Sequence, residues 1–87
     1  MTNVRLQEVV VSKIKELLDA SSKECVYQIT KISKGNGVAI CIKEAVHKPD
    51  GTTEYYQMGY NLKVYGIAGE EAVEKAIEKR YRKLLVE

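Results

Sequence analysis

The sequence has few of the residues that metal sites and membrane segments need. It contains two cysteines and one histidine among 87 residues, and the spacing of Cys25 and Cys41 fits no zinc pattern. The longest uninterrupted apolar run, Val38–Ile42, is far shorter than the ~20 residues of a membrane-spanning helix. Charges interrupt the sequence soon after Met1, so no apolar core of a signal peptide is present. We therefore expect no metal, no membrane association and a cytoplasmic location.

Neither the net charge nor the placement of the glycines indicates a specific chemistry. The formal net charge is +2 at pH 7, which is too small to indicate a nucleic acid partner by itself. The pair Gly35 and Gly37 does not open a helix, so it is not the phosphate-binding loop of a nucleotide site. The sequence places no nucleophile or orienting acid beside His47. We expect a protein that is not an enzyme and that needs no cofactor.

What the sequence does contain predicts one compact α+β domain spanning residues 1–87. Hydrophobic residues make up 45% and charged residues 30%, which is ordinary for a globular domain. Apolar residues recur with the helical period of 3.6 over 4–19 and 70–86. They recur with the strand period of two over 25–32, 38–46 and 54–65. The predicted fold is αβββα, a three-stranded antiparallel sheet meander with two helices packed on its one apolar face.

Each predicted helix has one apolar stripe that would cover the sheet. In the first helix the stripe contains Leu6, Val10, Val11, Ile14, Leu17 and Leu18 and leaves out Val9. In the last helix it contains Val73, Ala76, Ile77, Tyr81 and Leu84, with Leu85 at its margin. Thr2 or Asn3 is expected to cap the first helix.

The turn at Pro49-Asp50-Gly51 predicts the register of the second hairpin. With these three residues as the loop, Lys48 faces Thr52. The inward pairs are then Ile42 with Met58, Ile40 with Tyr60, and Val38 with Leu62. The outward pairs are Lys43 with Gln57, Cys41 with Gly59, and Ala39 with Asn61. Gly59 is a candidate bulge or bend in the long third strand.

The first hairpin turns at Ser33–Gly37, where Gly and Asn suit a tight turn. The apolar faces of its two strands match when odd-numbered residues of the first strand face even-numbered residues of the second, as in Ile29 opposite Ile42. In such a register Cys25 and Cys41 point to opposite faces, which excludes a disulfide between them. We expect both to be reduced thiols.

The order of the elements resembles that of the double-stranded-RNA-binding domain family. In that family a basic cluster of the type Lys-Lys-x-Ala-Lys begins the last helix and grips phosphates, and a loop between the first two strands enters a minor groove. Here the matching helix start, Gly69–Lys75, is acidic. The family's loop often carries a histidine, but the only histidine of this chain lies outside the matching loop, Lys34–Gly37. The resemblance implies the arrangement of elements, while the phosphate-gripping positions depart from the family.

The sheet face opposite the helices is the predicted protein interface. Tyrosine with amide and lysine neighbours suits a protein contact or a platform for stacking bases. The candidate interface residues are Lys43, Tyr55, Gln57, Asn61, Lys63 and Tyr65. Small outward residues would make the centre of this face flat, so that a partner strand, a partner helix or a second copy could lie there.

The last helix has a basic sector that could contact an anion. The candidate residues are Lys75, Lys79, Arg82 and Lys83. Such a sector binds nucleic acid or an acidic protein in some domains and is a solvated helix face in most. Glu44 is a further candidate, because the register places this carboxylate on the inward face opposite Tyr56. The alternative, which the sequence favours, is that Glu44 lies at the end of the sheet beyond the cover of the helices.

Two functional hypotheses follow. The favoured one is a small non-catalytic binding module that acts through protein–protein contact or self-association at the open sheet face or an edge strand. Such a module could be an inhibitor, an adaptor or an accessory protein of a mobile element. The alternative is a nucleic-acid-binding protein that uses the basic sector together with Lys43 and Lys63.

Overall fold

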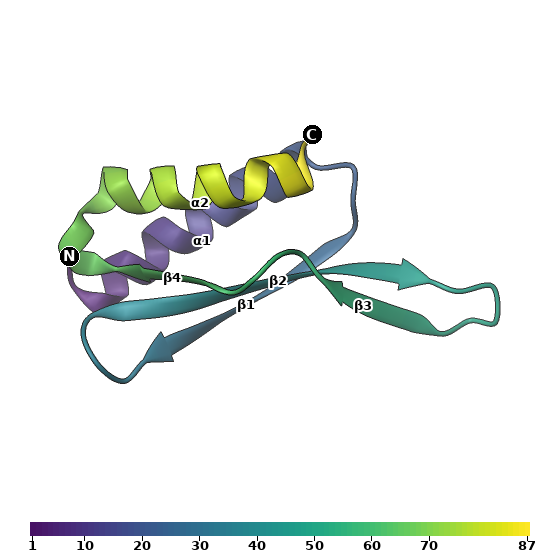
Figure 1. The fold of residues 1–87 in the computed structure, drawn as a ribbon, viewed down its shortest axis with the longest axis horizontal. Coiled ribbons are helices and arrows are strands. Elements are labelled where there is room, and N and C mark those ends of the chain that lie inside the picture. The colour runs from purple at the N-terminus through teal and green to yellow at the C-terminus, as the bar shows by residue number, and fades with distance from the viewer.

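The computed structural model describes all 87 residues. The elements along the chain are α1 (Asn3–Ala20), β1 (Cys25–Ile32), β2 (Gly37–His47), β3 (Thr53–Gln57), β4 (Leu62–Tyr65), the 3-10 helix η1 (Gly66–Ala68) and α2 (Glu70–Leu85). Both helices lie on one side of an antiparallel sheet (Figure 1). The predicted α+β class and helical layer are therefore confirmed, while the third predicted strand is divided into β3 and β4.

The central strand of the sheet is β2. It pairs with β1 along one edge, and with β3 and β4 in succession along the other. Its inward residues Val38, Ile40 and Ile42 are fully or almost fully buried. This strand has the alternating apolar pattern from which the sheet was predicted, and it supplies the floor of the core.

The core is a single cluster between the sheet and the two helices. Its thirteen members are Leu6, Val9, Val10, Ile14, Leu17, Val38, Ile40, Ile42, Val64, Val73, Ile77, Tyr81 and Leu85. Two details of the predicted helix stripes are wrong: Val9 is buried, and Leu85 is buried more deeply than Leu84.

The reason for the Val9 error is the contact between the helices. α1 and α2 run side by side in the same direction (Figure 1). Arg5 Nη2 lies 2.7 Å from Glu70 Oε1, and Lys13 Nζ lies 2.9 Å from Glu78 Oε2. Val9 stands between Arg5 and Lys13 at helical spacing, so it is covered by α2 rather than by the sheet. The Thr2 hydroxyl caps α1 by accepting from the Arg5 N–H.

The predicted register of the second hairpin holds near its turn and fails farther along. Lys48 N–H donates to Thr52 O at 2.8 Å, and Lys43 faces Gln57. Beyond Met58, however, Ile40 faces Leu62 and Val38 faces Val64. The predicted pairs of Ile40 with Tyr60, Val38 with Leu62, and Ala39 with Asn61 are therefore wrong. Cys41 pairs with Gln28 of β1 but has no partner on the other side of β2, because residues 58–61 leave the ladder.

These four residues, 58–61, form a bulge. Gly59 adopts φ +74°, a backbone conformation that glycine reaches without strain. Two extra residues preserve the period of two, so Leu62 and Val64 still face the helices. Tyr60 is turned away from the core into solvent and is 82% exposed, and its ring lies 5.7 Å from the guanidinium of Arg80 on α2. The predicted bend at Gly59 is confirmed, and the inward Tyr60 is a wrong prediction.

In the first hairpin, odd-numbered residues of β1 face even-numbered residues of β2 as predicted, but the register differs. Ile29 faces Ile40 rather than Ile42. Cys25 therefore packs against the core while Cys41 points to the opposite face, and both are free thiols, as predicted.

The far end of the second hairpin extends past the helices as an arm (residues 45–55; Figure 1). Every residue of β3 is exposed. Tyr56, which was expected to face the helices, is consequently uncovered on that side. The arm gives the molecule principal extents of 46 × 26 × 18 Å.

Candidate protein interface on the open sheet face

The sheet face away from the helices, called here the open face, carries the alternate side chains of each strand. By the observed pairing its residues are Val26, Gln28, Thr30, Ala39, Cys41, Lys43, Tyr55, Gln57, Lys63 and Tyr65. Five of the six predicted interface residues are among them. The sixth, Asn61, lies in the bulge and accepts a hydrogen bond from Gln57 Nε2 at 2.9 Å.

A hollow of about 430 Å³ lies on the open face between β1 and the base of the arm. It is lined by Val26, Tyr27, Gln28, Cys41, Lys43 and Tyr55. Val26 is 47% exposed and Tyr55 is 56% exposed, although both are large apolar side chains. Cys41, at the level of the bulge, lines the end of the hollow beside Gln28, its partner on β1. This part of the surface is therefore both concave and apolar.

The sequence interpretation found only part of this hollow. Lys43 and Tyr55 were named as candidates, whereas Val26 and Gln28 were not. The sequence could have identified Val26 and Gln28 as well, since alternation in β1 places both side chains on the face opposite Tyr27. What alternation could not reveal is that the hollow is centred between β1 and the base of the arm.

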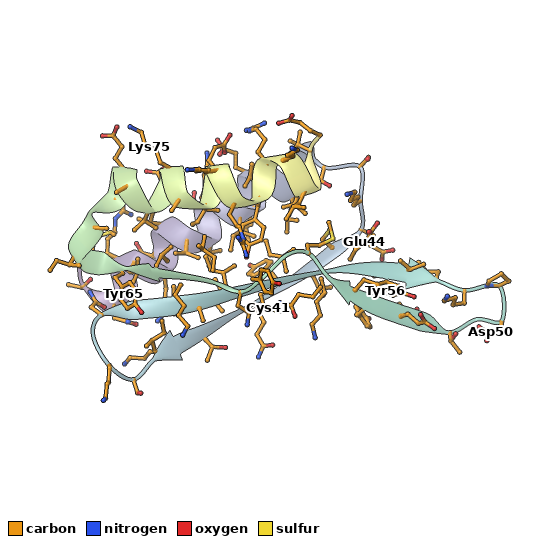
Figure 2. The ribbon with its side chains drawn as sticks, in the orientation of Figure 1. Cys41, Glu44, Asp50, Tyr56, Tyr65 and Lys75 are labelled. Atoms are coloured by element: carbon orange, nitrogen blue, oxygen red, sulfur yellow. The ribbon has the colours of Figure 1, made fainter.

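Tyr65 has a different role from Tyr55. A Cβ built on Gly37 would lie 2.6 Å from the Tyr65 ring, so the ring rests directly on the glycine backbone across the strand pair. An aromatic ring packed on a cross-strand glycine shields its backbone from water. Tyr65 therefore stabilises the β2–β4 end of the sheet (Figure 2), away from the hollow.

The free charges of the open face have one sign. Neither Lys43 nor Lys63 has a carboxylate within 4 Å, whereas Glu24 Oε2 lies 2.5 Å from His47 Nε2. The hollow is thus bordered by the Lys43 ammonium group, which no acid neutralises, and Lys63 lies farther along the same face. A partner with carboxylates around an apolar side chain would match this pattern.

The basic sector of α2 is separate from these lysines. Lys75 points away from the sheet (Figure 2), and its Nζ lies 3.0 Å from Glu71. Arg82 contacts Glu78, which raises the pKa of its guanidinium. Only Lys79 and Lys83 of the four candidates lack a carboxylate partner. The helices lie between this sector and the open face, so the two groups of cations do not form one surface.

Glu44 lies at the base of the arm, opposite Cys25 on one side and Tyr56 on the other. It is half-buried and has no ion-pair partner within 4 Å. Burial raises the pKa of the Cys25 thiol, and the Glu44 charge raises it further. The Tyr56 hydroxyl donates to Glu54 rather than to Glu44. No pocket is lined by Glu44.

His47 has neighbours that the sequence did not reveal. Its Nε2 contacts Glu24, and its Nδ1 lies 2.9 Å from Thr53 Oγ1. A carboxylate, an imidazole and a hydroxyl in a row resemble a hydrogen-bond relay of the kind that activates nucleophiles. His47 and Thr53 lie on the arm and Glu24 directly precedes β1. All three side chains are exposed, so water competes with each bond, and none of them lines a hollow.

No group of three or more His, Cys, Asp or Glu side chains is arranged to hold a metal ion. Neither helix combines the length and the apolar character needed to cross a bilayer. No protein-family model, curated protein or solved structure matches the chain.

Proposed function

We propose that this chain is a small non-catalytic binding module that acts through protein–protein contact at its open face. The observation that supports this most directly is the uncovered apolar hollow between Val26 and Tyr55. Removing such an apolar surface from water is favourable, and exposed concave apolar patches are typical of interaction sites. An inhibitor, an adaptor or an accessory protein would use the surface in this way.

The proposed partner places an apolar side chain in the hollow and carboxylates at its edge. The hollow can take one large side chain, which is the usual form of an interface anchor. Lys43 at its border would pair with a carboxylate, and Lys63 with a second one farther along β2 and β4. Such charges at a rim mainly increase the association rate and the selectivity for acidic partners.

Affinity measurements with paired variants test this proposal. The partner is first recovered by pulldown from the native host, and its dissociation constant is measured for each variant. Val26→Ser combined with Tyr55→Ser should weaken binding by about tenfold or more, because an apolar anchor contributes ~1–2 kcal/mol or more at an interface. Both side chains are exposed, so the fold should persist in circular dichroism.

Ile67→Ser is the matched control. Ile67 is 96% exposed on η1 and does not belong to the open face. This variant loses an exposed apolar side chain of similar size and should keep full affinity. Equal affinity of the wild type and the Val26/Tyr55 double variant would refute the proposal.

Nucleic acid binding through α2 is the alternative. The observation in its favour is that Lys79 and Lys83, one helical turn apart, are exposed and have no carboxylate partner. This alternative predicts that the protein shifts single- or double-stranded nucleic acid probes in a gel at low salt. The shift should be lost when both lysines are changed to glutamate. No shift at micromolar protein would retire this alternative.

A further inference from the structure

The outer edge of β1 is free along its whole length. β1 pairs only with β2, and Ala45 N–H donates to Glu24 O at 2.8 Å. Backbone direction alternates along an antiparallel strand. The even-numbered residues of β1 therefore bond to β2, while the odd-numbered residues direct their N–H and C=O groups away from the sheet. These residues are Cys25, Tyr27, Ile29 and Lys31.

This edge has almost none of the features that prevent strands from pairing. Natural edge strands are commonly short, bulged, or interrupted by proline or charge. β1 is eight residues long, and its first six residues, 25–30, contain no charge, glycine or proline. Most of them are β-branched or aromatic, which favours extended structure. The edge is thus suited to adding another strand.

Apolar side chains that nothing covers border the same edge. On α1, Val4, Val11 and Leu18 recur every seven residues on the side away from α2. Val4 is 68% exposed, and the other two are half-buried. Tyr27 and Ile29, on the helix side of β1, are also half-buried. α2 contacts β4 whereas α1 contacts β2, so this flank of α1 overlooks β1. An added strand would cover it.

We propose that the added strand is β1 of a second copy of this chain, paired antiparallel around a twofold axis at Gln28. In this register Gln28 faces Gln28 of the second copy, Tyr27 faces Ile29, and Lys31 faces Cys25. The proposal does not depend on the proposed function of the open face. It leaves both open faces on the same side of one continuous sheet.

Charge complementarity is the reason for choosing a second copy. Lys31 is exposed and has no acidic partner, and Glu44 is half-buried and has no basic partner. Within one chain they are far apart, because Glu44 faces Cys25 while Lys31 faces Val38. In the twofold pairing, Lys31 lies two strand spacings, about 10 Å between backbones, from Glu44 of the other copy. The small Cys25 between them lets the long lysine side chain reach the carboxylate.

The Lys31–Glu44 pairing fixes the register, because only an axis at Gln28 places Lys31 opposite Cys25, the partner of Glu44. Moving the axis to Tyr27 would place Lys31 opposite Lys23 of the second copy, which brings like charges together. With the axis at Gln28, every directly opposed pair within residues 25–31 avoids like charges. The side chains on the two faces also keep their environments, since facing residues have the same parity.

Charge reversal provides the main test. Light scattering or sedimentation should give a dimer mass for the wild type at about 100 μM. Lys31→Glu and Glu44→Lys each create two repulsive pairs across the axis and should each raise the dimer dissociation constant by about tenfold. An equimolar mixture of the two variants should associate as well as the wild type, because all four charges are then complementary. The variant with both changes should also recover dimerisation.

A cross-link tests the position of the axis. In a Cys25→Ser, Cys41→Ser background, Gln28→Cys should form a disulfide between copies on mild oxidation, because a non-hydrogen-bonded pair brings the two Cα atoms within disulfide range. Thr30→Cys is the matched control, since this register places its two copies about 13 Å apart. Circular dichroism checks that each variant is folded.

Several results would overturn the proposal. A monomer mass for the wild type at 100 μM would exclude pairing of β1 with a second copy. A dimer that survives both single charge reversals, or a mixture that does not associate, would exclude the Lys31–Glu44 pairing. Cross-linking of Thr30→Cys as fast as that of Gln28→Cys would exclude the axis at Gln28.

Discussion

At the scale of single residues, the two cysteines have different surroundings although they lie on adjacent strands. Cys25 faces the helices and Cys41 faces the hollow of the open face. Burial, and then the charge of Glu44, raise the pKa of the Cys25 thiol. Both effects oppose the thiolate, because one removes water and the other places a like charge nearby.

Replacing Glu44 by glutamine should lower the pKa of Cys25 towards its ordinary value. Loss of the negative charge removes one of the two opposing effects, so the thiolate appears at lower pH. The measurement is the pH profile of iodoacetamide alkylation in dilute Cys41→Ser protein, which should move to lower pH. Glu54→Gln, a change of another carboxylate on the arm, should leave the profile in place. An unmoved profile in Glu44→Gln would show that burial alone sets the pKa.

At the scale of elements, the bulge of residues 58–61 decides how β4 meets β2. It separates a ladder that follows the turn at Asp50 from a ladder shifted by two residues. Gly66 N–H donates to Asn36 O at 2.7 Å, which extends the second ladder to its end. The bulge therefore connects two well-paired segments and is not a frayed strand end.

Gly59→Ala should destabilise the domain by roughly 1–2 kcal/mol. Its φ is +74°, and a new Cβ would lie 3.1 Å from Leu84 Cδ1, so backbone strain adds to a tight contact with α2. The measurement is urea unfolding. Gly51→Ala is the control, because φ there is +91° but nothing lies within 4 Å. It should cost less, since it strains only the exposed arm. Equal losses in the two variants would contradict a packing role for Gly59.

At the scale of the whole molecule, the arm makes the shape longer than the chain length requires. The Cα radius of gyration is 13.7 Å, against about 12 Å for a compact domain of this size. The arm contributes no residue to the buried core, whereas the adjoining half of β2 supplies Val38, Ile40 and Ile42. One strand therefore belongs to the most buried and the least buried parts of the protein.

Hydrogen exchange should separate these two parts of β2. A two-stranded hairpin without a covered face is marginally stable by itself, so amides of the arm should exchange by local opening. Amides of 38–42 should exchange only by global unfolding and be the slowest in the chain. Mass spectrometry of exchanged peptides measures both. Arm amides as protected as those of 38–42 would show that a partner or a second copy covers the arm.

The sequence alone predicted whatever depends on local periodicity and turn chemistry. The helix and strand positions, the Lys48–Thr52 turn and the opposite faces of Cys25 and Cys41 follow from a period of 3.6 or two and from residues that prefer turns. A shift of two residues preserves these patterns, so the pattern could not distinguish Leu62 from Tyr60 as the partner of Ile40. The candidate open face was recoverable for the same reason, since its side chains alternate with the core.

Only the tertiary structure decided which apolar side chains are covered. Val9 is buried because α2 lies beside α1. Tyr60 is exposed because the bulge turns its side chain out of the core, beside Arg80 of α2. Val26 and Tyr55 belong to one hollow because β1 and the base of the arm flank the same part of β2. Periodicity reports which side of its own element a residue occupies. Whether a second element covers that side depends on contacts between segments distant in the chain, and no local pattern specifies them.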